Sequence, residues 1–513
     1  MRKMLAGLVL AAAAVSAYAI PEGPDPSTPA WFQREAQNYA RTGEAPLEEI
    51  ANPDFLLAWV LQTNANHLEW IQRAAGDPSW LLYPSGNTTL TPLAATWGLP
   101  ATGDPTRYAD MSGPNGSDFY SNEAEVVPVV IYDDGCARLS GRVWAPKGSH
   151  AGSNLPNVVI ENGSIQAPET LYWWFAQQLV RAGYVVMTFD PRGQGRSDQQ
   201  TPDGTQGSNA NAAVFWTGLV NVIDFFRSNP VTPYPHNVAC AGTYPTQVTA
   251  FNPFHDRIDL NRLGIAGHSL GATGVSVVQG YGAPGADPWP GKIDAQNPVK
   301  VAVAWDGLST GGGMGAPMTK PRVPAMSQNS EYGIGGAPFN AAPDPEGKKA
   351  AYAAWSAAGV PVVALSIQGS THFEWSLLPS FPATSWCADM SSGSCLGGWG
   401  NPMAQHYSLA WMDRWLKNPG ESGYDDADAR LLDDAPWCER YSFYYRAGRN
   451  FPDRGGAAHH AEDIRADCLA AAAGGYGTAA TAAADKSARY GGALNGALLL
   501  GLFLTALRRR ATG

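Results

Sequence analysis

Short apolar segments alternate with longer helical segments through the middle of this chain, from residue 126 to residue 416. The series opens with two apolar segments that an Asp-Asp-Gly turn joins at residues 133–135, a pattern typical of a β-hairpin. Strands that alternate with helices favour a parallel sheet, and such a sheet is buried under helices on both faces. We therefore expect an α/β fold with a mostly parallel central sheet.

The apolar periodicity places the expected elements along the chain. Strands are predicted at residues 126–132, 136–145, 157–161, 184–189, 263–266, 299–305, 322–326 and 360–367. Helices are predicted at residues 171–182, 212–227, 272–279 and 403–416, and a further helical stretch runs from residue 31 to about residue 74.

A Gly-His-Ser-Leu-Gly pentapeptide at residues 267–271 stands between a predicted strand and a predicted helix. A serine nucleophile at such a turn has a strained backbone, and the residues two positions away must lack bulk. Gly267 and Gly271 meet this need, and the N-terminus of the following helix favours negative charge. The context predicts Ser269 as the nucleophile of a serine hydrolase.

A serine hydroxyl needs a base within hydrogen-bond reach. Of the nine histidines, His372 stands in the loop after the last predicted strand, downstream of the serine, where this arrangement requires the base. His268 is expected to face away and to pack on the turn. His406 lies on a predicted helix, and the pair at 459–460 lies in a C-terminal extension.

The third member of such a site is a carboxylate that orients the histidine. The chain order restricts it to residues 270–371, and two candidates stand near strand ends. Asp306 directly follows the predicted strand 299–305. This position at the end of the strand is expected to point its short side chain into the active-site cleft. Glu331 lies several residues beyond the predicted strand 322–326.

Two further segments carry a family resemblance: Ser-Gln-Asn-Ser-Glu-Tyr at residues 327–332 and Gly-Ser-Thr-His at residues 369–372. With the pentapeptide, they resemble the platelet-activating factor acetylhydrolase branch of the α/β-hydrolases. By position, the resemblance implies Ser269 as nucleophile, Asp306 as acid and His372 as base. It also implies a calcium-independent esterase, acting on lipids with short or oxidised acyl chains and requiring no cofactor. A more distant similarity to dienelactone hydrolases and cutinase-like polyester hydrolases places the acid one strand later.

An oxyanion hole needs two backbone N–H donors. Leu270, directly after the nucleophile, is the first candidate. Residues 162–164 (Asn-Gly-Ser) stand where the resembled family has His-Gly-x, so Ser164 is the second candidate.

Charge and cysteine content narrow the class of protein. The net charge is −11 and the body of the chain has no Lys/Arg run, which argues against a nucleic-acid partner. Six cysteines in an exported chain predict disulfides, and only Cys387–Cys395 is close enough in sequence to pair by spacing. No two cysteines have the spacing of a zinc knuckle, so no structural metal is expected.

Both ends of the chain have the pattern of targeting segments. Residues 1–19 combine a basic start, an apolar run and Ala-Tyr-Ala, which is typical of a signal peptide. Near the other end, a Gly pair precedes the apolar segment 493–507 and three arginines, as in the GlyGly-type sorting signal of Gram-negative bacteria. The segment spans roughly 22 Å as a helix, short of a hydrocarbon core of about 30 Å. A plain membrane anchor is the alternative, and in both cases the body is extracytoplasmic, with export and sorting machinery as partners.

The sequence thus predicts a secreted serine esterase or lipase with an ester or lipid substrate. Three alternatives stay open: a polyester or cutinase-like hydrolase, a serine peptidase of the same fold, and an inactive surface binding module. The expected division is a signal peptide (1–19), an N-terminal extension (20–120), a catalytic domain (121–418), a Cys-bearing extension (419–470), an Ala/Gly linker (471–489) and a sorting or anchor tail (490–513).

Overall fold

The computed structural model describes residues 24–43, 72–82, 119–164, 168–208, 210–334, 337–376 and 400–473. The predicted signal peptide and the C-terminal tail lie outside these ranges, as do Cys387 and Cys395. Within these ranges, every helix is too short or too polar to cross a membrane.

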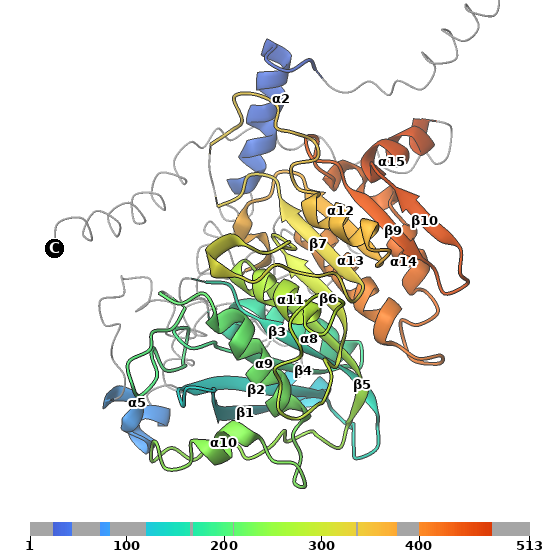
Figure 1. Cartoon of the computed structure of the whole chain (residues 1–513). Helices are drawn as coiled ribbons and strands as arrows, with labels where there is room; N and C mark the ends of the chain where they lie inside the picture. Colours follow the sequence, from blue (N-terminus) through green and yellow to red (C-terminus); the bar gives the residue numbers. More distant parts are fainter. Residues whose placement is uncertain are drawn as a thin grey trace, which may run out of the picture.

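One continuous sheet of ten strands runs through the described part of the chain, in the order β1-β2-β4-β3-β5-β6-β7-β8-β9-β10 (Figure 1). The six central strands from β4 to β8 pair in parallel, while β1 and β2 at one edge and β9 and β10 at the other pair antiparallel. The sheet is therefore mixed, with a parallel centre. The strands are β1 Ala124–Tyr132, β2 Arg138–Pro146, β3 Leu155–Glu161, β4 Val185–Phe189, β5 Ile258–His268, β6 Val299–Trp305, β7 Ala325–Ser330, β8 Val362–Ile367, β9 Gly448–Pro452 and β10 Ala458–Ala461.

Helices follow most of the strands. The α-helices are α2 Pro29–Ala40, α5 Ser79–Leu82, α8 Trp173–Arg181, α9 Val214–Arg227, α10 Pro235–Ala239, α11 Leu270–Gly280, α12 Ala350–Ala357, α13 Asn401–Leu416, α14 Ala427–Leu432 and α15 Ile464–Ala473. Shorter helical turns are η2 Arg41–Gly43, η3 Phe119–Glu123, η4 Glu169–Tyr172, η5 Gly313–Gly315, η6 His372–Trp375 and η9 Ala435–Arg440.

Helices bury both faces of the sheet. In β3, Val158 and Ile160 belong to an apolar cluster that includes residues of α8 and α13. Val159, between them, belongs to a second cluster that includes residues of α9, α11 and α12. Because successive side chains of a strand point to opposite faces, this division shows the two-sided burial of an α/β fold.

Two features of the sheet differ from the prediction. Strands β9 and β10 belong to residues 419–470, the segment predicted as a Cys-bearing extension, and they continue the central sheet beyond β8. They have no apolar run, because Arg449 and Asn450 lie in one and His459 and His460 in the other. Their sequences therefore show no apolar periodicity from which a strand could be predicted.

The second difference concerns β7, which ends at Ser330 and not at residue 326. Glu331 therefore follows its strand directly. The polar residues of this strand are buried because other elements pair with them: Gln328 donates to Ser408 Oγ on α13 at 2.9 Å, and Asn329 donates to the Leu365 carbonyl on β8 at 3.0 Å. Polar side chains with such partners extend a strand without apolar alternation.

Two N-terminal segments dock at separate places along the sheet, as Figure 1 shows for α2 and α5. On α2, Asn38 donates side-chain hydrogen bonds to Glu331 and to Tyr332, just past β7. On α5, Ser79 accepts a 2.6 Å hydrogen bond from Arg138 on β2. The guanidinium of Arg138 also lies 4.0 Å from the ring centroid of Trp80. The described residues of α2 and α5 thus pack against the elements that carry the sheet.

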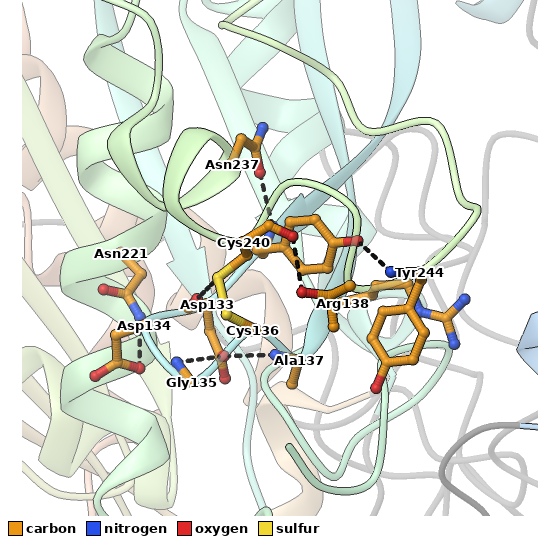
Figure 2. Close-up of a disulfide and its surroundings, with 12 residues drawn as sticks. Asp133, Asp134, Gly135, Cys136, Ala137, Arg138, Asn221, Asn237, Cys240 and Tyr244 are labelled. Atoms are coloured by element: carbon orange, nitrogen blue, oxygen red, sulfur yellow. Dashed lines mark hydrogen bonds between the residues drawn. A yellow bond between two sulfur atoms is a disulfide. The ribbon is translucent and has the colours of Figure 1, made fainter. Parts of the chain in front are cut away.

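Disulfides join the described cysteines, which confirms this class of bond for the chain. Cys136, in the turn between β1 and β2, pairs with Cys240 at the end of α10. Figure 2 shows this bond beside the Asp133-Asp134-Gly135 turn. Cys438 pairs with Cys468, which ties η9 to α15. The predicted Cys387–Cys395 pair falls outside the described residues and stays a prediction.

Candidate active site

The nucleophile candidate Ser269 stands at a sharp turn between β5 and α11. Its backbone has φ 59° and ψ −122°, a conformation that non-glycine residues rarely adopt and that marks strain. A Cβ on Gly267 would lie 2.6 Å from the Gly271 carbonyl oxygen, and one on Gly271 would lie 2.3 Å from the Asn162 carbonyl oxygen. Only glycine fits at both positions, as the pentapeptide predicted.

His372 lies in the loop that leaves β8, at the first position of η6. Its Nε2 atom is 2.8 Å from Ser269 Oγ. The backbone fixes this loop: the His372 N–H donates to the Gly333 carbonyl at 2.6 Å, and Thr371 Oγ1 accepts from the N–H of Phe373 as a helix cap. The base candidate is therefore held in reach of the hydroxyl from which it would take a proton.

Asp306 directly follows β6 and has φ 55°. Its Oδ2 atom contacts Nδ1 of His372, and its Oδ1 atom accepts from the N–H of Ser330 at 2.7 Å. Burial raises the pKa of Asp306, but the hydrogen bond and attraction to His372 and the Ser330 N–H outweigh it and hold the pKa well below its usual value. The carboxylate is thus ionised and accepts from Nδ1 of His372, and Nε2 is the ring nitrogen that faces Ser269 Oγ.

Glu331, the other acid candidate, forms its hydrogen bonds with groups other than His372. Its carboxylate accepts from the Gly369 N–H at 2.7 Å, from the Ser442 hydroxyl and from the Asn38 side chain. Burial raises the pKa of Glu331, although these three hydrogen bonds oppose the shift. Both oxygens are occupied by donors from α2, from the base-bearing loop and from the segment after η9. This geometry makes Glu331 an anchor of that loop.

The two candidate oxyanion donors belong to different segments: Leu270 follows Ser269 directly, and Ser164 follows Gly163 in the loop after β3. Leu270 is the first residue of α11, where a backbone N–H has no acceptor within the helix. Gly163 approaches closely from the loop after β3, since a Cβ on it would lie 3.3 Å from Ser269 Cβ. The Gly163 carbonyl accepts from the Gln194 side chain, which fixes this turn. Ser164 is half-buried next to it, and residues 165–167 lie outside the described ranges.

His268 does not face away as expected. Its Nε2 atom is 2.8 Å from the carbonyl oxygen of His372, and its Nδ1 atom is 2.9 Å from the hydroxyl of Tyr172. Burial and the charge of His372 lower the pKa of His268 to about 3. Only the position of His268 beside the serine hinted at a role for it, and nothing in the sequence singled out Tyr172.

The arrangement can perform acyl transfer: a hydroxyl, a base that accepts its proton and a carboxylate that orients the base converge at one edge of the sheet. In the described ranges, no group of three or more His, Cys, Asp or Glu side chains is placed to hold a metal ion.

The chain matches no protein-family model and no curated protein. Among solved structures, it is similar to a ferulic acid esterase from Streptomyces cinnamoneus, with 14% identity and a TM-score of 0.33, over 58% of this chain and 92% of that one. A TM-score of this size assigns neither a family nor a function.

Proposed function

We propose that this chain is an exported serine esterase of the α/β-hydrolase fold that hydrolyses carboxylic esters through an acyl-Ser269 intermediate. The observation that carries the proposal is the hydrogen-bonded series of Ser269, His372 and Asp306, with Ser269 Oγ 2.8 Å from His372 Nε2. The strained turn between β5 and α11 and the chain order Ser, Asp, His support the same assignment.

The proposed reaction has two steps. In the first, His372 Nε2 takes the proton of Ser269 Oγ as this oxygen attacks the ester carbonyl. The N–H groups of Leu270 and Ser164 stabilise the negative oxygen of the tetrahedral intermediate. The imidazolium, stabilised by Asp306, then gives its proton to the departing alkoxide, which leaves as the alcohol. In the second step a water takes the place of the alcohol, loses a proton to His372 and attacks the acyl carbon. The bond between the acyl carbon and Ser269 Oγ then breaks, His372 returns the proton to Oγ, and the carboxylic acid leaves.

The proposed substrates are esters with short or oxidised acyl chains, including lipids, as the family resemblance implies. The disulfides support an extracytoplasmic site of action, because such bonds persist in oxidising compartments. Export by the N-terminal segment and sorting or anchoring by the C-terminal tail are part of the proposal.

A substrate panel tests the function. p-Nitrophenyl esters of rising chain length, a phospholipid with a short sn-2 chain, a polyester and a peptide anilide are offered to the wild type, to Ser269→Ala and to Ser276→Ala. Ser276 is the control, because it is a buried serine of the same helix whose hydroxyl donates to the Ala272 carbonyl at 2.6 Å. We expect turnover of short-chain esters that Ser269→Ala abolishes and Ser276→Ala retains. Faster cleavage of the anilide would indicate a peptidase, and no turnover by the wild type would indicate a binding module.

A further inference from the structure

Three hydrogen bonds connect the loop after β3 to the loop after β8 through two side chains. The Gly163 N–H lies 2.9 Å from the hydroxyl oxygen of Tyr172. The same hydroxyl is 2.9 Å from Nδ1 of His268, and Nε2 of His268 is 2.8 Å from the carbonyl oxygen of His372. The connection therefore runs from the residue before the candidate oxyanion donor Ser164 to the backbone of the candidate base.

The donors and acceptors of this connection follow from its two ends. The His372 carbonyl can only accept, so His268 Nε2 carries a hydrogen and donates it. In a neutral imidazole the other nitrogen is then an acceptor, so the Tyr172 hydroxyl donates to Nδ1. The Tyr172 oxygen in turn accepts from the Gly163 N–H. The Tyr172 hydroxyl and the His268 ring thus each accept one hydrogen bond and donate another, and all three bonds run in one direction from Gly163 to His372.

We infer that Tyr172 and His268 are positioning residues that couple the base-bearing loop to the oxyanion loop, an inference that rests on the proposed esterase function. Neither side chain would touch the reacting atoms. Tyr172 would hold the turn that presents the Ser164 N–H, and His268 would hold the backbone from which the His372 ring projects. Rates of acyl transfer depend steeply on such placement, since a displacement of about 1 Å can cost 10²-fold.

Burial and ring contact fit this role. Tyr172 is fully buried and His268 is 3% exposed, so water does not compete for the two hydrogen bonds of the Tyr172 hydroxyl, while the bond to the His372 carbonyl is part-buried. The rings of His268 and His372 lie 4.6 Å apart between centroids, with a 37° angle between their planes. A histidine that stays neutral is needed at this distance, because a second positive ring would oppose the imidazolium that His372 becomes. The low pKa of His268 meets that condition.

A double-mutant cycle tests the coupling. The variants are Tyr172→Phe, His268→Phe, the double variant and His268→Gln, whose side-chain amide can still donate to the His372 carbonyl. Tyr184→Phe is the matched control, because Tyr184 is also fully buried and its hydroxyl donates to Asp413 at 2.7 Å, outside the site. The measurements are kcat and KM for a short-chain p-nitrophenyl ester, together with the thermal unfolding midpoint.

We expect Tyr172→Phe and His268→Phe each to lower kcat by at least about 10-fold, because each removes two of the three hydrogen bonds and one such bond contributes about 10-fold. KM should change less than about threefold. The double variant should lose no more than His268→Phe alone, and His268→Gln should recover part of the loss. Tyr184→Phe should lower the midpoint and leave kcat unchanged.

Losses that multiply in the double variant would overturn the coupling, as would an unchanged kcat in Tyr172→Phe or an equal kcat loss in Tyr184→Phe. If the His268 variants do not fold, Tyr172→Phe decides alone, because it removes a single oxygen atom. Fluorophosphonate labelling of wild-type Ser269 separates the two claims. Without labelling the esterase function itself fails, whereas labelling combined with an unaffected Tyr172→Phe refutes only the coupling.

Discussion

The backbone N–H of Ser330 donates a 2.7 Å hydrogen bond to Oδ1 of Asp306, the oxygen opposite the one that contacts His372. The hydroxyl of Ser330 adds a second bond of 2.8 Å to the same oxygen. With Oδ1 held in this way, Oδ2 is left to orient the imidazole. This relationship follows from the register of the parallel strands β6 and β7, which brings the end of one beside the end of the other.

Exchange of each carboxylate for its amide distinguishes the two acid candidates. Asp306→Asn should lower kcat by about 10⁴, because the amide favours the wrong tautomer of the base. Glu331→Gln should keep at least roughly a tenth of kcat and lose stability, because its oxygens anchor backbone and side-chain donors away from the imidazole. Steady-state kinetics and thermal unfolding check both variants. An inactive Glu331→Gln beside an active Asp306→Asn would place the acid one strand later.

Gly163 is predicted to be needed for full activity on steric grounds. In Gly163→Ala the new Cβ would lie 2.8 Å from the Tyr172 hydroxyl, 3.1 Å from Nδ1 of His268 and 3.3 Å from Ser269 Cβ. We expect kcat to fall about 10- to 100-fold because the loop must shift away from the serine.

Gly218→Ala on α9 is the control for this variant. Its Cβ meets no atom within 4 Å, and alanine in a helix interior is favoured by roughly 1 kcal/mol. The control should keep its activity and unfold at a higher temperature. Equal kcat values for Gly163→Ala and the wild type would refute the close approach.

The two disulfides are predicted to contribute differently to the free energy of unfolding. Cys136 and Cys240 are 104 residues apart, whereas Cys438 and Cys468 are 30 apart. Because the entropy lost by the unfolded chain grows with loop length, removal of the first should cost about 1 kcal/mol more than removal of the second. Urea unfolding of the two Cys-to-Ser double variants measures the difference. A larger cost for the shorter loop would contradict the prediction.

The stability of the fold is predicted to change with pH because of the buried carboxyl group of Asp224. Burial raises its pKa from 3.8 to about 6, against the hydrogen bonds it accepts from the Lys292 and Ile293 N–H groups. Because the folded pKa is the higher one, its contribution to stability is fully present below about pH 4 and is lost as pH rises through 6. The wild type should therefore lose up to ~3 kcal/mol relative to Asp224→Asn between pH 4 and pH 7. A pH-independent difference between the two would show that Asp224 does not titrate in this way.

The sequence predicts those strands and helices that show an apolar pattern within their own residues. Strand β6, Val299–Trp305, has its predicted bounds, and the turn between β5 and α11 lies at the pentapeptide. The side chains predicted for nucleophile, base and acid come together because parallel strands end at one edge of the sheet.

What the sequence did not predict depends on partners distant along the chain. Strand β9 pairs with β8 although it carries Arg449, whose side chain donates to the Leu431 carbonyl at 2.9 Å. Tyr172 and His268 meet across 96 residues, and Asn38 and Glu331 across 293. Such contacts leave no local pattern, because each side chain is satisfied only once the fold has formed.

Covalent labelling of Ser269 tests the central claim most directly. The wild type and Ser269→Ala are treated with a fluorophosphonate, digested and analysed by mass spectrometry, with circular dichroism to establish that both are folded. We predict one adduct, on the peptide that contains Ser269, and none in the variant. An unlabelled wild type, or a variant labelled as fully as the wild type, would contradict the assignment of Ser269 as the nucleophile.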